Sequence, residues 1–204
     1  MEKFARIISA IFHPLLMLPY CVMFALYATE LMFAYPIEKL LVVAISLTFM
    51  TIIPGVALWV LKRLRYITSY DIENRKERDI PYIVMIVCSA AGTILQSLMW
   101  APSWFVGLHC GIIGALGAAY IFNGWWKVSL HGIGVGGMMG VVIAAAPYGI
   151  TAMNLPFSIA TLIAGLVCSS RITLGRHTLG QTLFGTALGA AGTVLGAWIY
   201  THSL

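Results

Sequence analysis

Long apolar runs alternate with short polar linkers along the whole chain. Seven runs approach the length of about 20 residues that a helix needs to cross a bilayer core. They cover about residues 7–27, 40–61, 81–99, 104–122, 131–148, 155–169 and 178–200. None shows the alternating pattern of a membrane strand, so strands are not expected. The pattern predicts an all-α, polytopic membrane helical bundle of seven spans. Six is the alternative count, because the sixth run is the shortest and only residues 100–103 separate the third from the fourth.

Composition agrees with this pattern. Apolar residues make up 60% of the chain and charged residues 9%, with a mean hydropathy of +0.92. A soluble globular domain does not have such a balance, so the chain is predicted to be an integral membrane protein. No composition shift marks a boundary, and residues 1–204 are predicted to form a single domain. The first run is too long for a signal-peptide core and lacks a clear cleavage site, which favours a retained span. The four cysteines lie inside apolar runs without the spacing of a disulfide framework or a zinc site.

The charge distribution predicts an orientation. The formal net charge is +5, but nearly all the cations flank apolar runs, which favours topology and phosphate binding over nucleic acid. In the seven-span arrangement every lysine and arginine except Lys39 falls on one side. Cytoplasmic loops carry the excess of positive charge, so that side is predicted to be cytoplasmic. The N-terminus is then inside and the C-terminus outside.

Glycines recur at helical spacing in the later runs, and small residues let membrane helices approach closely. We expect these stripes to pack helices within one bundle, and a homodimer through one stripe is the alternative. The glycines are Gly107, Gly111, Gly114 and Gly117, then Gly132, Gly136 and Gly140, then Gly185, Gly189, Gly192 and Gly196.

A polar island between the last two runs, residues 170–181, is the strongest candidate for chemistry. Charge at a membrane boundary needs partners. If a helix begins near Gly175, His177 and Gln181 stand four residues apart on one face. Gln181 could then bond one ring nitrogen of His177, which leaves the other free to attack or to transfer a proton. A helix N-terminus beside the guanidinium groups of Arg171 and Arg176 predicts an anion site suited to phosphate.

The spacing of this island resembles the third signature motif of the type 2 phosphatidic acid phosphatase superfamily, the membrane lipid-phosphate phosphatases. That motif reads Ser-Arg, five residues, His, three residues, Asp. Ser170, Arg171 and His177 match it, and Gln181 replaces the aspartate. The resemblance implies that His177 is the nucleophile, that Arg171 and Ser170 bind the phosphate, and that Gln181 orients the ring. An amide cannot stabilise the imidazolium with charge, as a carboxylate does.

Two further stretches resemble the other motifs of that family less closely. Ser129 and His131 match the serine and histidine of Pro-Ser-Gly-His, which implies that His131 protonates the leaving alcohol and that Ser129 and the Gly132 backbone bind phosphate. The first motif, a lysine separated by six residues from Arg-Pro, is degenerate here. Arg78 is the candidate for its phosphate-clamping arginine, with Arg75 and Lys76 behind it. Two apolar runs separate each of the three stretches from the next, so all three are expected at one face.

The resemblance implies a metal-independent and cofactor-independent membrane phosphatase that hydrolyses a lipid phosphate monoester or diphosphate through a phosphohistidine. Its expected partner is a phospholipid or polyprenyl phosphate substrate in the bilayer, and no nucleic acid. Two alternatives stay open: a catalytically weakened phospholipid-binding or scaffold membrane protein, and a small transporter with a polar substrate path. The remaining histidines, His13, His109 and His202, have no motif partners and are interpreted as packing or interface residues.

Overall fold

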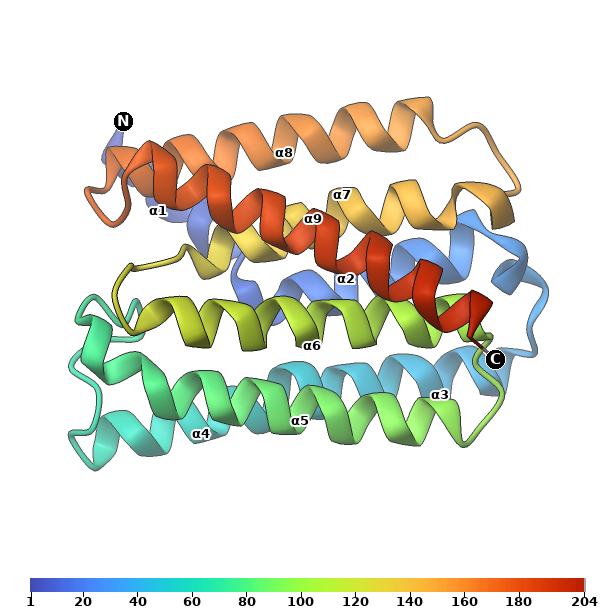
Figure 1. Ribbon diagram of the computed structural model, residues 1–204, viewed down its shortest axis with the longest axis horizontal. Helices are drawn as coiled ribbons and strands as arrows, with labels where there is room; N and C mark the ends of the chain where they lie inside the picture. The colour runs from blue at the N-terminus through green and yellow to red at the C-terminus, as the bar shows by residue number, and fades with distance from the viewer. Residues whose placement is uncertain (204) are drawn as a thin grey trace.

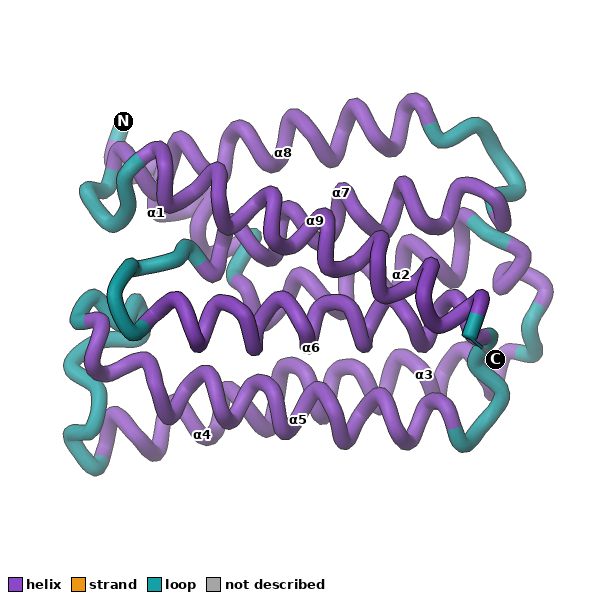
Figure 2. The backbone as a smooth tube through the Cα atoms, viewed as in Figure 1, coloured by secondary structure: helices purple, strands orange, loops and turns teal. Residues whose placement is uncertain are grey.

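A computed structural model describes residues 1–203, and this part of the chain is built from helices (Figures 1 and 2). Its one β-type contact is an isolated bridge between Thr29 and Gly149. The predicted all-α bundle is therefore confirmed. The elements are α1 (Glu2–Ile11), α2 (Pro14–Ala28), η1 (Glu30–Phe33), α3 (Pro36–Leu47), η2 (Thr48–Ile52), α4 (Ile53–Arg63), η3 (Arg75–Arg78), α5 (Asp79–Ser97), α6 (Ser103–Asn123), α7 (Leu130–Ala145), η4 (Ala146–Tyr148), α8 (Asn154–Thr173) and α9 (Leu179–His202).

Six helical segments are long and apolar enough to cross a membrane, which identifies an integral, multi-pass membrane protein. Two of the predicted runs are modified: the second becomes the continuous segment α3–η2–α4, and the first is split into α1 and α2. The axes of α1 and α2 differ by 55°, and the pair makes a seventh span if it is counted as one. Figure 1 shows the N-terminus at one end of the bundle and the C-terminus at the other, as an odd number of crossings requires.

The break between α1 and α2 follows from His13 and Pro14. Proline lacks a backbone N–H and pushes the preceding residue out of the helical region, and His13 has an extended ψ of 140°. Pro14 then suits the first position of α2, where its missing N–H would have no partner. The His13 ring caps the new helix, because its Nδ1 accepts the Leu15 N–H at 3.3 Å.

The glycine stripes pack α9 against α6 and α7. A Cβ atom built on Gly136 would overlap the Thr186 carbonyl, and one on Gly111 would overlap the Gly192 carbonyl. The backbones therefore lie closer than any larger residue allows, and the expected packing within one bundle is confirmed. Gly114 has open space around its Cβ position and takes no part in this packing.

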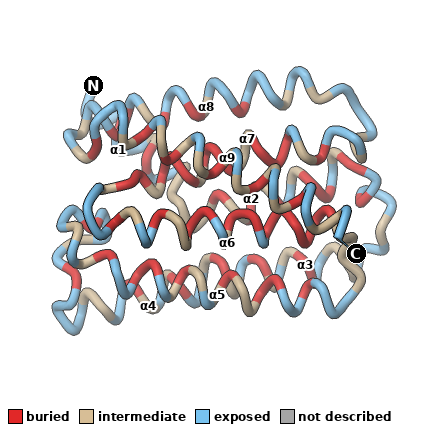
Figure 3. Tube along the Cα trace, in the orientation of Figure 1, coloured by how far each residue is buried: buried red, intermediate tan, exposed pale blue. Residues whose placement is uncertain are grey.

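The outer faces of the helices carry large apolar side chains. Leu162 in α8 and Leu195 in α9 are 65% and 56% exposed in the isolated chain. Figure 3 shows such exposed stripes running along the outside, with buried residues toward the centre. Hydrocarbon solvates these faces in a bilayer, so the buried interior does not need to be the most apolar part of the molecule.

Three polar loops, residues 64–74, 124–129 and 174–178, lie at the end of the bundle that carries the N-terminus, drawn at the left of Figure 1. We call it the site end. The candidate motifs, far apart in the sequence, are all found there, as the expected number of spans between them requires.

Candidate functional site

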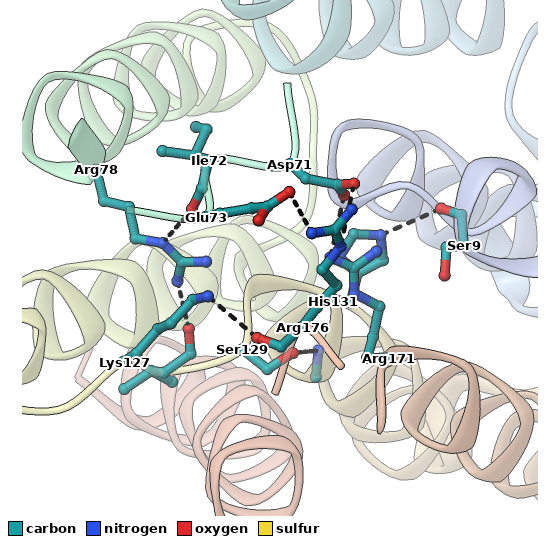
Figure 4. A network of polar contacts seen from close by, with 12 residues as sticks. Ser9, Asp71, Ile72, Glu73, Arg78, Lys127, Ser129, His131, Arg171 and Arg176 are labelled. Carbon is teal, nitrogen blue, oxygen red and sulfur yellow. Dashed lines mark hydrogen bonds and ion pairs between the residues drawn. The ribbon is translucent and has the colours of Figure 1, made fainter. Parts of the chain in front are cut away.

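A polar pocket opens at the site end, and six of its lining residues are histidine, arginine or aspartate. They are His13, Asp71, Arg78, His131, Arg171 and His177. They come from the α1–α2 break, the loop 64–74, η3, the start of α7, the end of α8 and the loop before α9. Figure 4 shows four of them, Asp71, Arg78, His131 and Arg171. Four of them, His177, His131, Arg171 and Arg78, were predicted from the sequence. The tertiary structure thus brings residues of all three candidate motifs around one cavity.

His177 is positioned by two consecutive helix-capping motifs. Helix α8 ends in a Schellman motif: Gly175 has a φ of +65°, its N–H donates to the Ile172 carbonyl, and the Arg176 N–H donates to the Arg171 carbonyl. Helix α9 then begins with a capping box between Thr178 and Gln181. The sequence from Leu174 to Gln181 therefore specifies a short rigid turn with His177 held between two helix ends.

Gln181 determines which ring nitrogen of His177 carries the proton. Its Oε1 accepts the Thr178 backbone N–H at 3.2 Å, so this amide atom is the oxygen. The same Oε1 lies 3.1 Å from the Nδ1 of His177, which must therefore donate. The Nε2 atom of the neutral ring is then left with its lone pair, as a nucleophile requires.

The electrostatic surroundings keep the His177 ring neutral. Burial lowers its pKa most, and the positive charges of Arg78 and Lys127 lower it further, to about 3. The Gln181 hydrogen bond acts in the opposite direction but is outweighed. At neutral pH the lone pair of Nε2 is therefore available in essentially every molecule.

His131 is buried at the start of α7 with 6% of its surface exposed. Its Nε2 lies 3.1 Å from the Ser9 carbonyl oxygen. A carbonyl only accepts, so Nε2 carries the proton and Nδ1 is the nitrogen that can exchange one. The ring of His13 packs edge-on against it, with the ring centroids 5.7 Å apart. Two histidines with different hydrogen-bond partners therefore line the same pocket as His177.

The two pocket arginines are held in different ways. Arg171, with a side chain 3% exposed, donates from Nη2 to Asp71 Oδ1 at 3.0 Å. Arg78 donates to two backbone carbonyls, from Nε to Ile72 at 2.9 Å and from Nη1 to Val128 at 2.8 Å. Among residues 1–203 no carboxylate forms an ion pair with Arg78. Its charge is therefore fixed in place and open to an anion, whereas that of Arg171 already has a counter-ion.

Carboxylates of the loop 64–74 reach over the cations of the loop before α9. Asp71 pairs with Arg171 and lies 3.8 Å from the Arg176 Nε, and Glu73 pairs with Arg176 (Figure 4). Both carboxylates are at least 40% exposed, so water weakens these pairs. The loop supplies negative charge where an anionic ligand would bind.

Five residues predicted to bind phosphate do not line the pocket: Arg75, Lys76, Ser129, Gly132 and Ser170. The side chains of Ser129 and Ser170 serve helices, because Ser129 Oγ accepts the Gly132 N–H at the start of α7 and Ser170 Oγ donates to the Leu166 carbonyl. Gly132 lies against α9, where a Cβ atom would overlap the Thr182 carbonyl. These residues shape the helices that carry His131 and Arg171.

Arg75 and Lys76 stand on η3, the helical turn before α5. The Arg75 backbone carbonyl accepts a hydrogen bond from Asn123 at 3.0 Å, and Lys76 is exposed. Of the cations on this turn only Arg78 is buried, because the carbonyls of Ile72 and Val128 accept hydrogen bonds from its guanidinium.

Three residues at the site were not among the predicted site residues: His13, Asp71 and Lys127. His13, interpreted from the sequence as a packing or interface residue, packs on His131 and also lines the pocket. Asp71 stands seven residues before Arg78, where the resembled motif has its lysine. Lys127 supplies a cation instead: its Nζ donates to the Arg176 carbonyl at 3.1 Å, and its charge acts on the His177 ring. Its place two residues before Ser129 was the available signal.

Burial lowers the pKa of Lys127, and the nearby charge of Arg78 lowers it further. Both effects arise because Lys127 and the neighbouring arginines lie close together in a small, partly dehydrated volume. Such a cluster favours a bound anion. Among the described residues no group of three or more His, Cys, Asp or Glu side chains is arranged to hold a metal ion.

Comparison with protein-family models, with curated proteins and with solved structures found no match to this chain.

Proposed function

We propose that the protein is a membrane phosphatase that hydrolyses a lipid phosphate monoester or diphosphate through a phosphohistidine intermediate. The observation that carries the proposal is the geometry of His177. Its Nδ1–H is held by Gln181 at 3.1 Å, its Nε2 is left unprotonated, and it lines one pocket with Arg78, Arg171 and His131.

The chemistry follows from these groups. The phosphate of the substrate binds between the guanidinium groups of Arg78 and Arg171, which neutralise its oxygens. The Nε2 lone pair of His177 attacks phosphorus while the ester P–O bond breaks. Nδ1 of His131 receives a proton from the phosphate monoanion as the substrate binds and passes it to the departing alkoxide, which gives the lipid alcohol. The phosphoryl group stays on His177.

The second half of the reaction regenerates the protein. His131, now neutral, accepts a proton from water through Nδ1 as the water oxygen attacks phosphorus and the P–N bond breaks. The proton passes from His131 to the inorganic phosphate as it leaves, so both histidines return to their neutral starting states. Gln181 orients the ring throughout and accepts the Nδ1–H bond while positive charge develops.

Asp71 is displaced or shared during binding in this scheme. Its carboxylate pairs with Arg171 in the unliganded pocket. A substrate phosphate carries more charge and more acceptor oxygens than a carboxylate, so it competes effectively for the guanidinium. Asp71 thereby acts as the resting counter-ion of Arg171.

The site end is proposed to face the cytoplasm, because it carries the excess of cations. A cysteine at Asn74, which is exposed in the loop 64–74, tests this. In intact cells it should resist a membrane-impermeant thiol reagent and react after permeabilisation. Labelling in intact cells would reverse the orientation.

Phosphate release by the purified protein from a panel of lipid phosphates tests the function. We expect turnover of at least one lipid phosphate and a loss of more than a hundredfold in His177→Ala, with the helical circular dichroism unchanged. An acid-stable pattern of labelling by radioactive substrate would contradict a phosphohistidine, which is acid-labile. Binding of lipid phosphate without release would favour the scaffold alternative.

A further inference from the structure

A second cavity lies inside the bundle next to the polar pocket. It is bounded by α2, η2, α4, α5, α6 and α7, with a contribution from α9. The space open to the centre of a water molecule in it is about 70 Å³. Four residues, Pro14, Leu15, Met85 and Leu130, line both this cavity and the polar pocket. The two spaces are therefore neighbours across one shared wall of apolar side chains.

The wall of this second cavity is almost entirely apolar. Representative lining residues are Met17, Val22, Phe105, Leu108, Ile133 and Val141. Its polar side chains are few: Thr193 Oγ1 donates to the Gly189 carbonyl, and His109 Nδ1 bonds the Phe105 carbonyl at 2.9 Å while its Nε2 has no partner. Water gains few hydrogen bonds in such a space, whereas a hydrocarbon chain fits its chemistry.

The cavity also has depth along the bundle. Leu130 at the polar pocket and Val141 at the far end are both on α7. With a rise of about 1.5 Å per residue, Val141 lies about 16 Å below Leu130 along the helix. Carbon–carbon bonds of about 1.5 Å let an extended chain of about a dozen carbons cover that depth.

Resting on the proposed function, we propose that this cavity holds the hydrocarbon chain of the substrate whose phosphate occupies the polar pocket, and that the substrate class is a lipid phosphate with a single chain inserted between the helices. The position of the cavity identifies the occupant, because the four shared residues border both the apolar space and the polar pocket in which the phosphate is proposed to bind. One narrow cavity takes one chain.

The cavity selects by shape in this arrangement. A lipid chain moves from one apolar medium to another when it leaves the bilayer for the bundle, so hydrophobic transfer contributes little to its binding. The packing of the chain in the cavity therefore decides its affinity. Filling the cavity with a larger side chain should therefore discriminate against long chains. A larger side chain on the outer face of the same helix should not.

Two variants of α7 make this comparison. Val141 is 5% exposed and lines the cavity, whereas Ile143, two residues on, is 46% exposed. The readout is the ratio of kcat/KM for dodecyl phosphate to that for butyl phosphate, because a general loss of folded protein cancels from it. We expect Val141→Phe to lower this ratio at least tenfold and Ile143→Phe to leave it within twofold of the wild type. An unchanged ratio in Val141→Phe, or an equal fall in both variants, would overturn the proposal.

A binding measurement separates the chain site from the catalytic proposal. Dodecyl phosphate with a diazirine at its terminal carbon is photolysed with the wild-type protein and with His177→Ala, and the labelled peptides are mapped. Labels at Val22, Phe105, Leu108 or Val141 support the chain site even if no phosphate is ever released, in which case only the proposed function fails. Labels confined to outward-facing residues such as Ile143 or Leu162 would overturn the chain site even if both phosphates are hydrolysed.

Discussion

Under the proposed mechanism, replacing Gln181 by glutamate should increase the rate at which His177 is phosphorylated. Glutamate has the length of glutamine, so it can keep both bonds that Oε1 now accepts, from His177 Nδ1 at 3.1 Å and from the Thr178 N–H at 3.2 Å. The change adds one negative charge at the ring. It stands in the first turn of α9, where negative charge also suits the helix dipole.

The expected gain can be worked from the geometry. The charge of an imidazolium is spread over its ring, about 4 Å from the carboxylate, and two unit charges at that distance interact by about 4 kcal/mol at an effective dielectric constant of about 20. If roughly a third of a positive charge has developed on the ring in the transition state, the stabilisation is about 1.4 kcal/mol, or about tenfold in rate. The new carboxylate also repels the anionic substrate, which raises KM. Measuring kcat separates this effect on binding from the stabilisation of the transition state.

The carboxylate should also raise the pKa of His177 above its present value of about 3, because it favours the protonated ring. The nucleophile must be neutral, so the acid limb of the kcat/KM profile should move to higher pH. Single-turnover phosphorylation and a pH–rate profile measure the two effects. Gln181→Met, which keeps the length and removes the acceptor, is the control and should slow phosphorylation. A slower reaction in Gln181→Glu with an unmoved acid limb would refute the assigned hydrogen bond.

Three further predictions follow from particular contacts. In the wild type, kcat/KM should persist as the pH falls through about 6.5 and decline only toward the pKa of His177 at about 3. The unfolded ring binds a proton near pH 6.5, so the folded state should lose stability as the pH falls across that interval. In chemical unfolding, His177→Ala should lose less stability than the wild type between about pH 7 and pH 5. Asp71→Asn should lower KM severalfold by removing the resting counter-ion of Arg171, and should lower the unfolding temperature in a way that inorganic phosphate reverses; a raised KM would show that Asp71 positions Arg171 instead. Gly136→Ala should cost about 1–3 kcal/mol of unfolding free energy by forcing α7 away from Thr186, whereas Gly114→Ala, which meets nothing within 4 Å, should not; equal stabilities would contradict the close packing.

The local sequence pattern was sufficient to predict the membrane bundle and several of the pocket residues. The length of an apolar run decides whether it can cross a bilayer, and that length can be counted directly along the sequence. His177 and Gln181 also interact within one helical turn, so their hydrogen bond was predictable from a spacing of four residues. Counting spans was enough to expect His131, Arg171 and Arg78 at the same end.

The rest of the site was decided by contacts between distant segments. His13 reaches the pocket because Pro14 breaks the first run, and it then packs on His131, more than a hundred residues away in the sequence. Asp71 pairs with Arg171 across 100 residues, and Lys127 bonds the Arg176 carbonyl across 49. No local period encodes these pairings.

Tertiary packing also decided which candidate cations and hydroxyls turn inward. Arg78 and Arg75 are three residues apart in one charged loop, and only Arg78 is buried, because carbonyls of Ile72 and Val128 receive its guanidinium. The sequence by itself determined the spans and the residue types available at their ends. The three-dimensional packing selected, from those residues, the ones whose charges find partners at the pocket, since a buried charge is retained only where partners exist for it.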